Sequence, residues 1–280
     1  MKLFLVILGV TAAFAVPHQE SIELDYHGKI GIPMAARIKA AEEATDFDGS
    51  RIVGGSPSEL GDFPYVGGVI VNLVSGGQSV CGSALISANR ALTAAHCWTT
   101  GSHEGILLTV VFGSKRLFSG GQRVITNNVQ VHSEYNTVTR ANDIAVLVLP
   151  NVASSEYIKP ISIASGNNLY NGVVASAAGF GIVSDGTPIT TGQTLNNVDL
   201  TVISNQECAR TFAAFVVSST LCVSGANGKS TCSGDGGSPL VVNDQLIGLA
   251  SFQSSSGCQR NLPAGFTRIT SYNTWIRSRL

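Results

Sequence analysis

Short β-rich runs separated by glycine, asparagine and serine occupy most of this 280-residue chain. Such punctuation is typical of strands joined by tight turns. The sequence therefore predicts an all-β fold, and two antiparallel barrels fit the distribution of the runs. Asn243-Asp244 predicts a hairpin turn, and residues 271–280, with Trp275 and Ile276 among polar neighbours, predict an amphipathic C-terminal helix. The predicted strands are residues 69–74, 84–87, 107–112, 122–131, 144–149, 173–178, 195–203, 239–242 and 245–252.

The N-terminal region differs from the rest in composition. Residues 1–15 combine a lysine, an apolar stretch and a small-x-small ending, which is the pattern of a secretory signal peptide. Residues 16–51 carry seven acidic and four basic side chains and no cysteine, so we expect a removable activation propeptide. Residues 52–280 have twelve basic and eleven acidic side chains, a net charge of +1, which offers no attraction to nucleic acid or to an anionic membrane.

Six cysteines in a chain with a secretory leader predict three disulfides. Their number alone permits fifteen connectivities. A zinc site is disfavoured because no Cys-x-x-Cys pair occurs, and no other metal, nucleotide or haem motif is present. We expect no cofactor.

Three motifs follow one another along the chain and resemble those of the chymotrypsin family of secreted serine proteases. In that family they supply a histidine general base, an aspartate that orients it and a nucleophilic serine. The resemblance covers residues 52–280, and the loops look similar to those of insect digestive chymotrypsins. It implies two antiparallel six-stranded β-barrels with a C-terminal helix. The motifs are Ala94-Ala95-His96-Cys97, Asn142-Asp143-Ile144-Ala145 and the loop of residues 232–240, Cys-Ser-Gly-Asp-Gly-Gly-Ser-Pro-Leu.

Further roles follow from the same resemblance. Arg51-Ile52-Val53-Gly54 matches a zymogen activation site: cleavage after Arg51 frees the amine of Ile52, which pairs with Asp235. Ser251 matches a serine that supports the aspartate. The implied oxyanion donors are the backbone N–H groups of Gly234 and Gly236. The implied disulfides are Cys81–Cys97, Cys208–Cys222 and Cys232–Cys258.

The nucleophile itself departs from the family pattern. The family's serine comes four residues after the first cysteine of its loop, where this chain has Gly236. Ser238 lies two residues later, and two extended residues span up to about 6.6 to 7.2 Å, whereas a base must lie within about 2.6 to 3.2 Å of the hydroxyl that it deprotonates. Pro239 also restricts the backbone of Ser238. We therefore expect His96 and Asp143 to be in place without an effective nucleophile.

The resemblance also indicates what the cleft accepts. Ser230 falls at the floor of the specificity pocket, where it gives no countercharge for lysine or arginine, and Gln253 and Ala264 fall on the pocket wall. An apolar or aromatic preference follows. Alternatively, these residues belong to ordinary loops at the edge of a barrel.

Three interpretations remain open. The first, which we favour, is a secreted, catalytically impaired protease homologue that binds peptides, protein substrates or protease inhibitors after activation by a trypsin-like protease. The second is an active digestive endopeptidase that uses the displaced Ser238. The third is that Gly236 is a variant or a sequence error. In each case we expect a monomer outside the cell.

Overall fold

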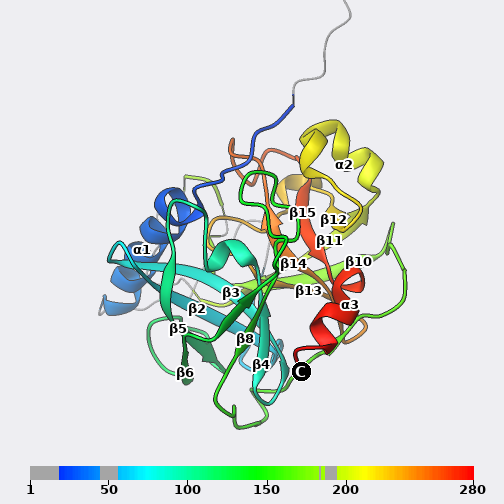
Figure 1. Ribbon diagram of the computed structural model, residues 1–280. Coiled ribbons are helices and arrows are strands. Elements are labelled where there is room, and N and C mark those ends of the chain that lie inside the picture. The colour runs from blue at the N-terminus through cyan, green and yellow to red at the C-terminus, as the bar shows by residue number, and fades with distance from the viewer. Residues whose placement is uncertain (1–18, 45–55, 183, 187–193) are drawn as a thin grey trace, which may run out of the picture.

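The computed structural model describes residues 19–44, 56–182, 184–186 and 194–280. Two β-sheets form its two halves, and α3 (Ile269–Arg277) closes the chain (Figure 1). The chymotrypsin-type all-β fold is confirmed. Along the described chain, no helix has the length and apolar character needed to cross a membrane.

The N-terminal half is a curled, antiparallel seven-stranded sheet in the order β6-β5-β2-β3-β4-β8-β7. The predicted run 122–131 is divided into two strands, β6 and β7, on opposite edges of this sheet. The strands are β2 (Val66–Leu73), β3 (Gln78–Ser87), β4 (Arg90–Thr93), β5 (Gly105–Phe112), β6 (Gln122–Thr126), β7 (Val129–Val131) and β8 (Ala145–Val148).

The C-terminal half contains a closed barrel of six antiparallel strands, because β11 pairs with both β10 and β12. β1 pairs antiparallel with the first residues of β11, and β9 pairs parallel with the first residues of β14. Asn243 and Asp244 both have positive φ and join β13 to β14, which confirms the predicted hairpin turn. The strands are β1 (Ser56–Pro57), β9 (Ser162–Ile163), β10 (Val174–Gly179), β11 (Asn196–Ile203), β12 (Thr220–Val223), β13 (Pro239–Val242), β14 (Gln245–Phe252) and β15 (Ala264–Arg268).

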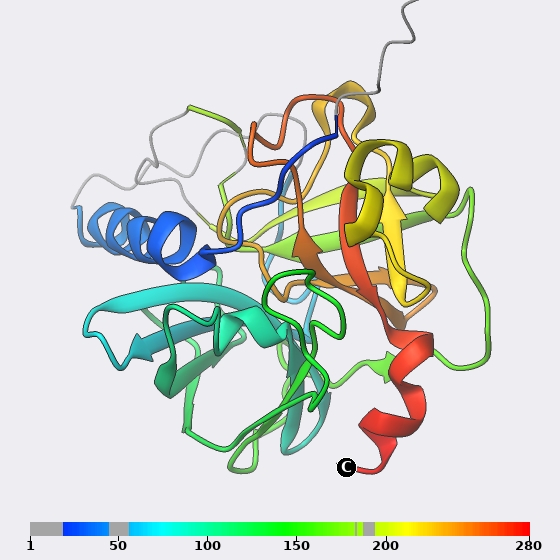
Figure 2. The same ribbon diagram turned by 45° about the horizontal axis from the view of Figure 1, so that its top comes forward.

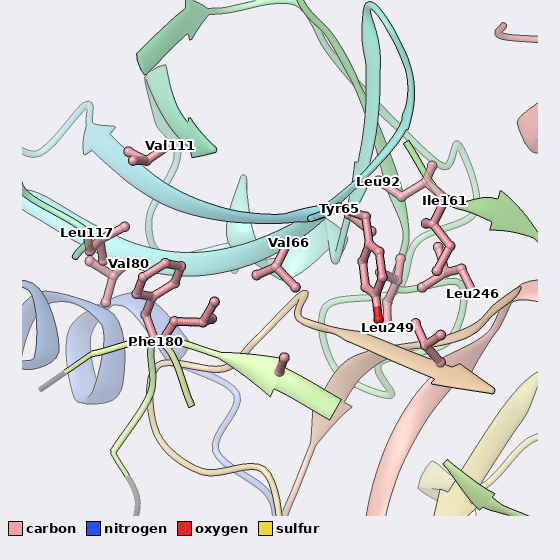
Figure 3. Close-up of a cluster of buried hydrophobic side chains, with 14 of the residues drawn as sticks. Tyr65, Val66, Val80, Leu92, Val111, Leu117, Ile161, Phe180, Leu246 and Leu249 are labelled. Carbon is pink, nitrogen blue, oxygen red and sulfur yellow. The ribbon is translucent and has the colours of Figure 1, made fainter. Parts of the chain in front are cut away.

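The main apolar core lies where the two halves meet. Figure 3 shows Val80 and Leu117 from one half close to Phe180, and Tyr65 directed toward Leu249 of the other half. Each half also has a core of its own, around Phe112 in the first and Phe266 in the second. Burying side chains of this size stabilises the fold by about 1.5–3 kcal/mol each. The loops at the junction are therefore held between two packed cores.

Helices lie outside the sheets. α1 (Ile32–Glu43) follows a π-helical turn (His27–Gly31) and has Pro33 in its first turn, where the missing N–H costs nothing. Its buried face consists of Met34, Ala35, Ile38 and Ala41. α2 (Asn205–Phe212) begins at Ser204, whose side chain accepts from the N–H of Glu207. Three 3₁₀ turns are Ala95–Cys97, Ala213–Phe215 and Ala226–Gly228.

Residues 19–44 are folded onto both halves of the molecule. Figure 2 shows the blue chain passing between the loops of the two halves before it enters α1. Met34, Ala35 and Ile38 belong to the same core as Phe180 and Leu249. The sequence predicts a removable propeptide over residues 16–51 and no structure within it, whereas residues 32–43 form α1.

Candidate active site

His96 and Asp143 form a buried pair between the two halves of the molecule. His96 lies in the 3₁₀ turn that follows β4, and Asp143 lies just before β8, which pairs with β4. The ring nitrogen Nδ1 of His96 is 2.7 Å from Oδ2 of Asp143, and the backbone N–H of His96 donates to Oδ1 at 2.9 Å. Pairing of β4 with β8 thus brings together two residues that are 47 positions apart.

Two hydroxyl groups hold Asp143 in place. Ser251 Oγ donates to Oδ2 at 2.6 Å, and Thr267 Oγ1 donates to the backbone carbonyl of Asp143 at 2.7 Å. Burial alone raises the pKa of Asp143, but His96 and the hydrogen bonds more than offset it, so this pKa lies below its usual value. The predicted support of Asp143 by Ser251 has the expected geometry.

The same arrangement leaves His96 suited to accept a proton. Burial lowers the pKa of His96, and the neighbouring Asp143 offsets this only in part, which favours the neutral imidazole. With Nδ1–H donating to Asp143, Nε2 carries the free lone pair. Among the described residues, Nε2 has no hydrogen-bond partner.

The backbone directs position 236 at this free nitrogen. A Cβ built on Gly236 would overlap Nε2 of His96 and would lie 3.0 Å from the Cε2 and Cζ atoms of Tyr26. The carbonyl of Gly236 accepts from the N–H of Gly82 at 2.7 Å, which fixes the loop against β3. A side chain at position 236 would therefore face the base.

Ser238 faces elsewhere. Its Oγ is fully buried and has no hydrogen-bond partner within the described part of the chain. It points toward Gly179 on β10, where an added Cβ would lie 2.6 Å from it. The Ser238 backbone is paired on both sides, with its N–H donating to Asp235 and its carbonyl accepting from Ala250, each at 2.9 Å. The structure brings His96, Asp143 and Ser251 together, and no hydrogen bond joins Ser238 to His96.

The loop before Gly236 is held by Asp235. Its carboxylate accepts from the N–H of Gly181 at 2.8 Å and from that of Cys232 at 2.9 Å. Burial raises the pKa of Asp235 to about 6 despite these two bonds. Arg51 and Ile52, the other two predicted activation residues, lie outside the described residues. Gly234 has a φ of +99°, which a side chain would strain.

A cavity of about 270 Å³ lies beside position 236, and its wall includes Ser251 and Gln253, as predicted. Ser230 instead lines a smaller neighbouring cavity together with Asp235. Ala264 is buried in β15 and does not line the larger cavity. In this uncleaved chain, the predicted floor and one predicted wall residue are thus not part of the cavity.

Sequence reasoning missed the residues that the N-terminal segment contributes to the site. Tyr26 packs on His96, and Arg140 donates from Nη2 to the backbone carbonyls of Glu23 and Leu24 at 3.0 and 3.2 Å. No local motif marks these contacts, because the partners are 70 to 117 positions apart. The only signal in the sequence was the apolar spacing of residues 34–41.

The three predicted disulfides, Cys81–Cys97, Cys208–Cys222 and Cys232–Cys258, are all present. The first ties β3 to the turn that carries His96, and the third ties the loop of Gly236 to residue 258. Each closes a loop that adds about 3 kcal/mol in the chain-entropy model.

Comparison with known proteins agrees with this geometry. The family model described as Trypsin matches residues 52–276. The chain belongs to the trypsin family. Among its trypsin-family relatives, collagenase from Hypoderma lineatum is 36% identical over 81% of this chain and 86% of its own length. Serine protease 1 from Drosophila melanogaster is 34% identical, over 81% and 84%. The solved structure of HL collagenase has a TM-score of 0.75 and 34% identity, over 81% of this chain and 98% of its own.

Membership of the trypsin family gives the pair of His96 and Asp143 its context. Proteins of this fold place a peptide in the cleft between the two halves, beside the histidine and aspartate. In this chain both side chains and the serine that supports the aspartate are in position. Position 236, where the sequence predicts a departure from the family's nucleophile, faces this pair.

Proposed function

We propose that this protein is a secreted trypsin-family homologue that binds peptides or protease inhibitors in its cleft and hydrolyses them poorly or not at all. The observation that carries the proposal is the direction of position 236. A Cβ there points at the free Nε2 of His96, and the residue is glycine. Without a hydroxyl at that point, the base has no nucleophile to activate.

The geometry of the other site residues is consistent with the loss of the nucleophile alone. His96, Asp143 and Ser251 have the geometry of a working base. The N–H groups of Gly234 and Gly236 are the proposed oxyanion donors. Loss of the nucleophile in a comparable triad lowers turnover by about 10⁶-fold, which corresponds to roughly 8 kcal/mol of barrier.

Maturation follows the zymogen scheme in this proposal. Residues 1–15 form the signal peptide, residues 16–51 the activation propeptide, and a trypsin-like protease cuts after Arg51. The new ammonium of Ile52 then pairs with Asp235, which is half-buried and whose carboxylate accepts hydrogen bonds from the backbone N–H groups of Gly181 and Cys232. Formation of that ion pair remodels the loops so that Ser230, Gln253 and Ala264 line a pocket for apolar or aromatic side chains. Three disulfides support an oxidising, extracellular location.

Hydrolysis of an aromatic peptide substrate tests the function. The chain is cleaved after Arg51, cleavage is verified by mass spectrometry, and the rate is compared with that of Gly236→Ser. We expect the unmodified chain to be inert and the variant to cut. The double variant Gly236→Ser, His96→Ala is the control for a contaminating protease. Equal hydrolysis by the unmodified chain and Gly236→Ser would contradict the proposal and direct attention to Ser238.

A further inference from the structure

We propose that residues 20–43 are an internal ligand of the cleft, which stays bound after the chain is cut at Arg51 and must dissociate before any peptide can enter. This inference rests on the proposed function, because it concerns the regulation of the same cleft. It adds a second step to activation: the cut alone does not open the site.

The segment enters the cleft through an isolated β-bridge. Ile22 pairs antiparallel with Ser254, and the N–H of Ser255 donates to the carbonyl of Ser21 at 2.9 Å. The Glu20 carboxylate accepts from Ser254 Oγ at 2.6 Å and from Ser256 Oγ at 3.1 Å. These residues directly follow β14, whose end forms the wall of the cavity beside Gly236. Backbone pairing at a sheet edge is a general way to bind an extended peptide.

Tyr26 covers the catalytic centre. Its ring centroid lies 4.6 Å from that of His96, and only 5% of the residue is exposed. The Tyr26 hydroxyl donates to the carbonyl of Val80 at 3.0 Å, and the Tyr26 ring lies beside Gly236, whose N–H is a proposed oxyanion donor. Tyr26 therefore covers the face of the base and occupies the space next to the loop that a reacting carbonyl would need to reach.

Gly236 makes this arrangement possible. The Cβ of any larger residue would overlap His96 Nε2 and press on the Tyr26 ring at 3.0 Å. The missing side chain and the inserted tyrosine thus occupy complementary space. Gly236 therefore has two effects: it leaves the site without a nucleophile, and it leaves room for Tyr26 to pack on His96.

Two further contacts hold the segment on either side of Tyr26. Arg140 is buried in the loop before Asp143, and its guanidinium donates to the carbonyls of Glu23 and Leu24. On the other side, His27 is fully buried with Nδ1 2.8 Å from Ser79 Oγ on β3. Both contacts come from the N-terminal half, whereas Ser254 and Ser256 bind the segment from the C-terminal half.

The far end of the segment is anchored by Glu42. Its carboxylate accepts from the N–H of Leu117 at 2.6 Å, from the N–H of Phe118 at 3.0 Å and from Ser119 Oγ at 3.0 Å. Charge-assisted bonds of this kind are stronger than neutral ones. Between this anchor and Tyr26, Met34 and Ile38 lie in the main core.

All these contacts involve residues before position 45, so a cut after Arg51 breaks none of them. Cleavage turns an intramolecular ligand into a separate peptide, which lowers its effective concentration without changing its contacts. The cut chain therefore retains the peptide until it dissociates, and its lifetime depends on Tyr26 and Glu42.

Peptide retention after cleavage is the test. The full chain is cut, mass spectrometry confirms the cut, and the protein is passed through a gel-filtration column. Denaturing mass spectrometry of the protein peak then measures the retained propeptide over time. The variants are Tyr26→Ala and Glu42→Gln, and Glu43→Gln is a matched control because it changes the adjacent, exposed carboxylate. We expect the unmodified chain and Glu43→Gln to retain the peptide, and the other two to release it at least tenfold faster.

Immediate loss of the peptide from the unmodified chain, or equal release from all four proteins, would overturn the inference. The experiment measures the amount of retained propeptide by mass, so its result does not depend on whether the cleft hydrolyses substrates. If Arg51 is not cut, the proposed activation fails, and hydrogen exchange on the uncut chains decides the inference instead. Exchange at the amides of Ser255 and Leu117 should be faster in Tyr26→Ala and Glu42→Gln than in Glu43→Gln; equal exchange in all of them would contradict it.

Discussion

The ring of Tyr26 lies against the ring of His96 at a tilt of 57°. Tyr26 precedes the proposed cleavage site, and His96 is the proposed base. A part of the chain that activation is expected to remove is thus in direct contact with the catalytic histidine.

Gly236→Ser should destabilise the uncut chain. The added Cβ would collide with His96 and Tyr26, and overpacking of this kind costs about 1–3 kcal/mol. In a Tyr26→Ala background the cost should be smaller, because one of the two neighbours is gone. Urea unfolding of the four proteins gives the coupling as a double-mutant cycle. A coupling near zero would show that Tyr26 does not occupy the space beside position 236.

Asp235 should make the uncut chain less stable as pH rises. Its pKa is raised to about 6 from an ordinary value of 3.8, so between these values the folded state holds a proton that the unfolded state has lost. The favourable contribution is complete below pH 3.8 and is lost as pH rises through 6, a change of about 3 kcal/mol. The unfolding free energies of the unmodified chain and of Asp235→Asn are measured at pH 4 and at pH 7. The difference between the two proteins at each pH gives the contribution of Asp235. No difference in pH dependence would contradict the assignment.

Protonation of His27 at acidic pH should weaken the packing of residues 20–43 in the cleft. Burial lowers its pKa to about 3, with further repulsion from His96, His103 and Arg140, which outweighs the attraction of Asp25. Neutral His27 therefore contributes stability that is complete above pH 6.5 and is lost as pH falls toward 3. Hydrogen exchange over residues 20–43 should be faster at pH 4.5 than at pH 7. In His27→Asn the difference should shrink; an unchanged difference would assign the effect to other groups.

Ser251→Ala should reduce the stability of the fold more than the equivalent substitution of an exposed serine. Ser251 donates at 2.6 Å to the buried carboxylate of Asp143, whereas Ser176 donates at the same distance to Asp199 in an exposed pair. Loss of a bond to a buried charge costs about 1–3 kcal/mol, and an exposed substitution typically stays within about 0.5 kcal/mol. Thermal unfolding of Ser251→Ala and Ser176→Ala provides the comparison. Equal losses would mean that Ser251 does not support the aspartate.

The parts of the fold that the sequence predicted are those with local signals. Asn243-Asp244 specifies its hairpin, and the motifs of His96 and Asp143 lie at adjacent ends of β4 and β8, which pair. α2 was missed although Ser204 and Glu207 form a recognisable capping pattern. Ser230 lines the smaller cavity with Asp235, and Ala264 is held in β15 by its pairing with Val223; motif spacing determines neither position.

The sequence does not predict that residues 20–43 pack in the cleft, for a different reason. Its contacts join residues far apart, such as Glu20 with Ser254 and Glu42 with Leu117. Residues 16–51 have the composition of a removable propeptide because they carry seven acidic and four basic side chains and no cysteine. Only the folded cleft shows that the apolar residues of the segment match it.

Covalent labelling with a serine-directed phosphonate decides whether any serine of this cleft is a nucleophile. The chain is cut after Arg51, release of the propeptide is verified by mass spectrometry, and the probe is added. Peptide mass spectrometry then locates the label in the unmodified chain, Gly236→Ser and Ser238→Ala. We expect no label on the unmodified chain or on Ser238→Ala, and a label at position 236 of Gly236→Ser. A label on Ser238 of the unmodified chain would contradict the proposed loss of the nucleophile, because a buried hydroxyl with no contact to His96 would then be the nucleophile.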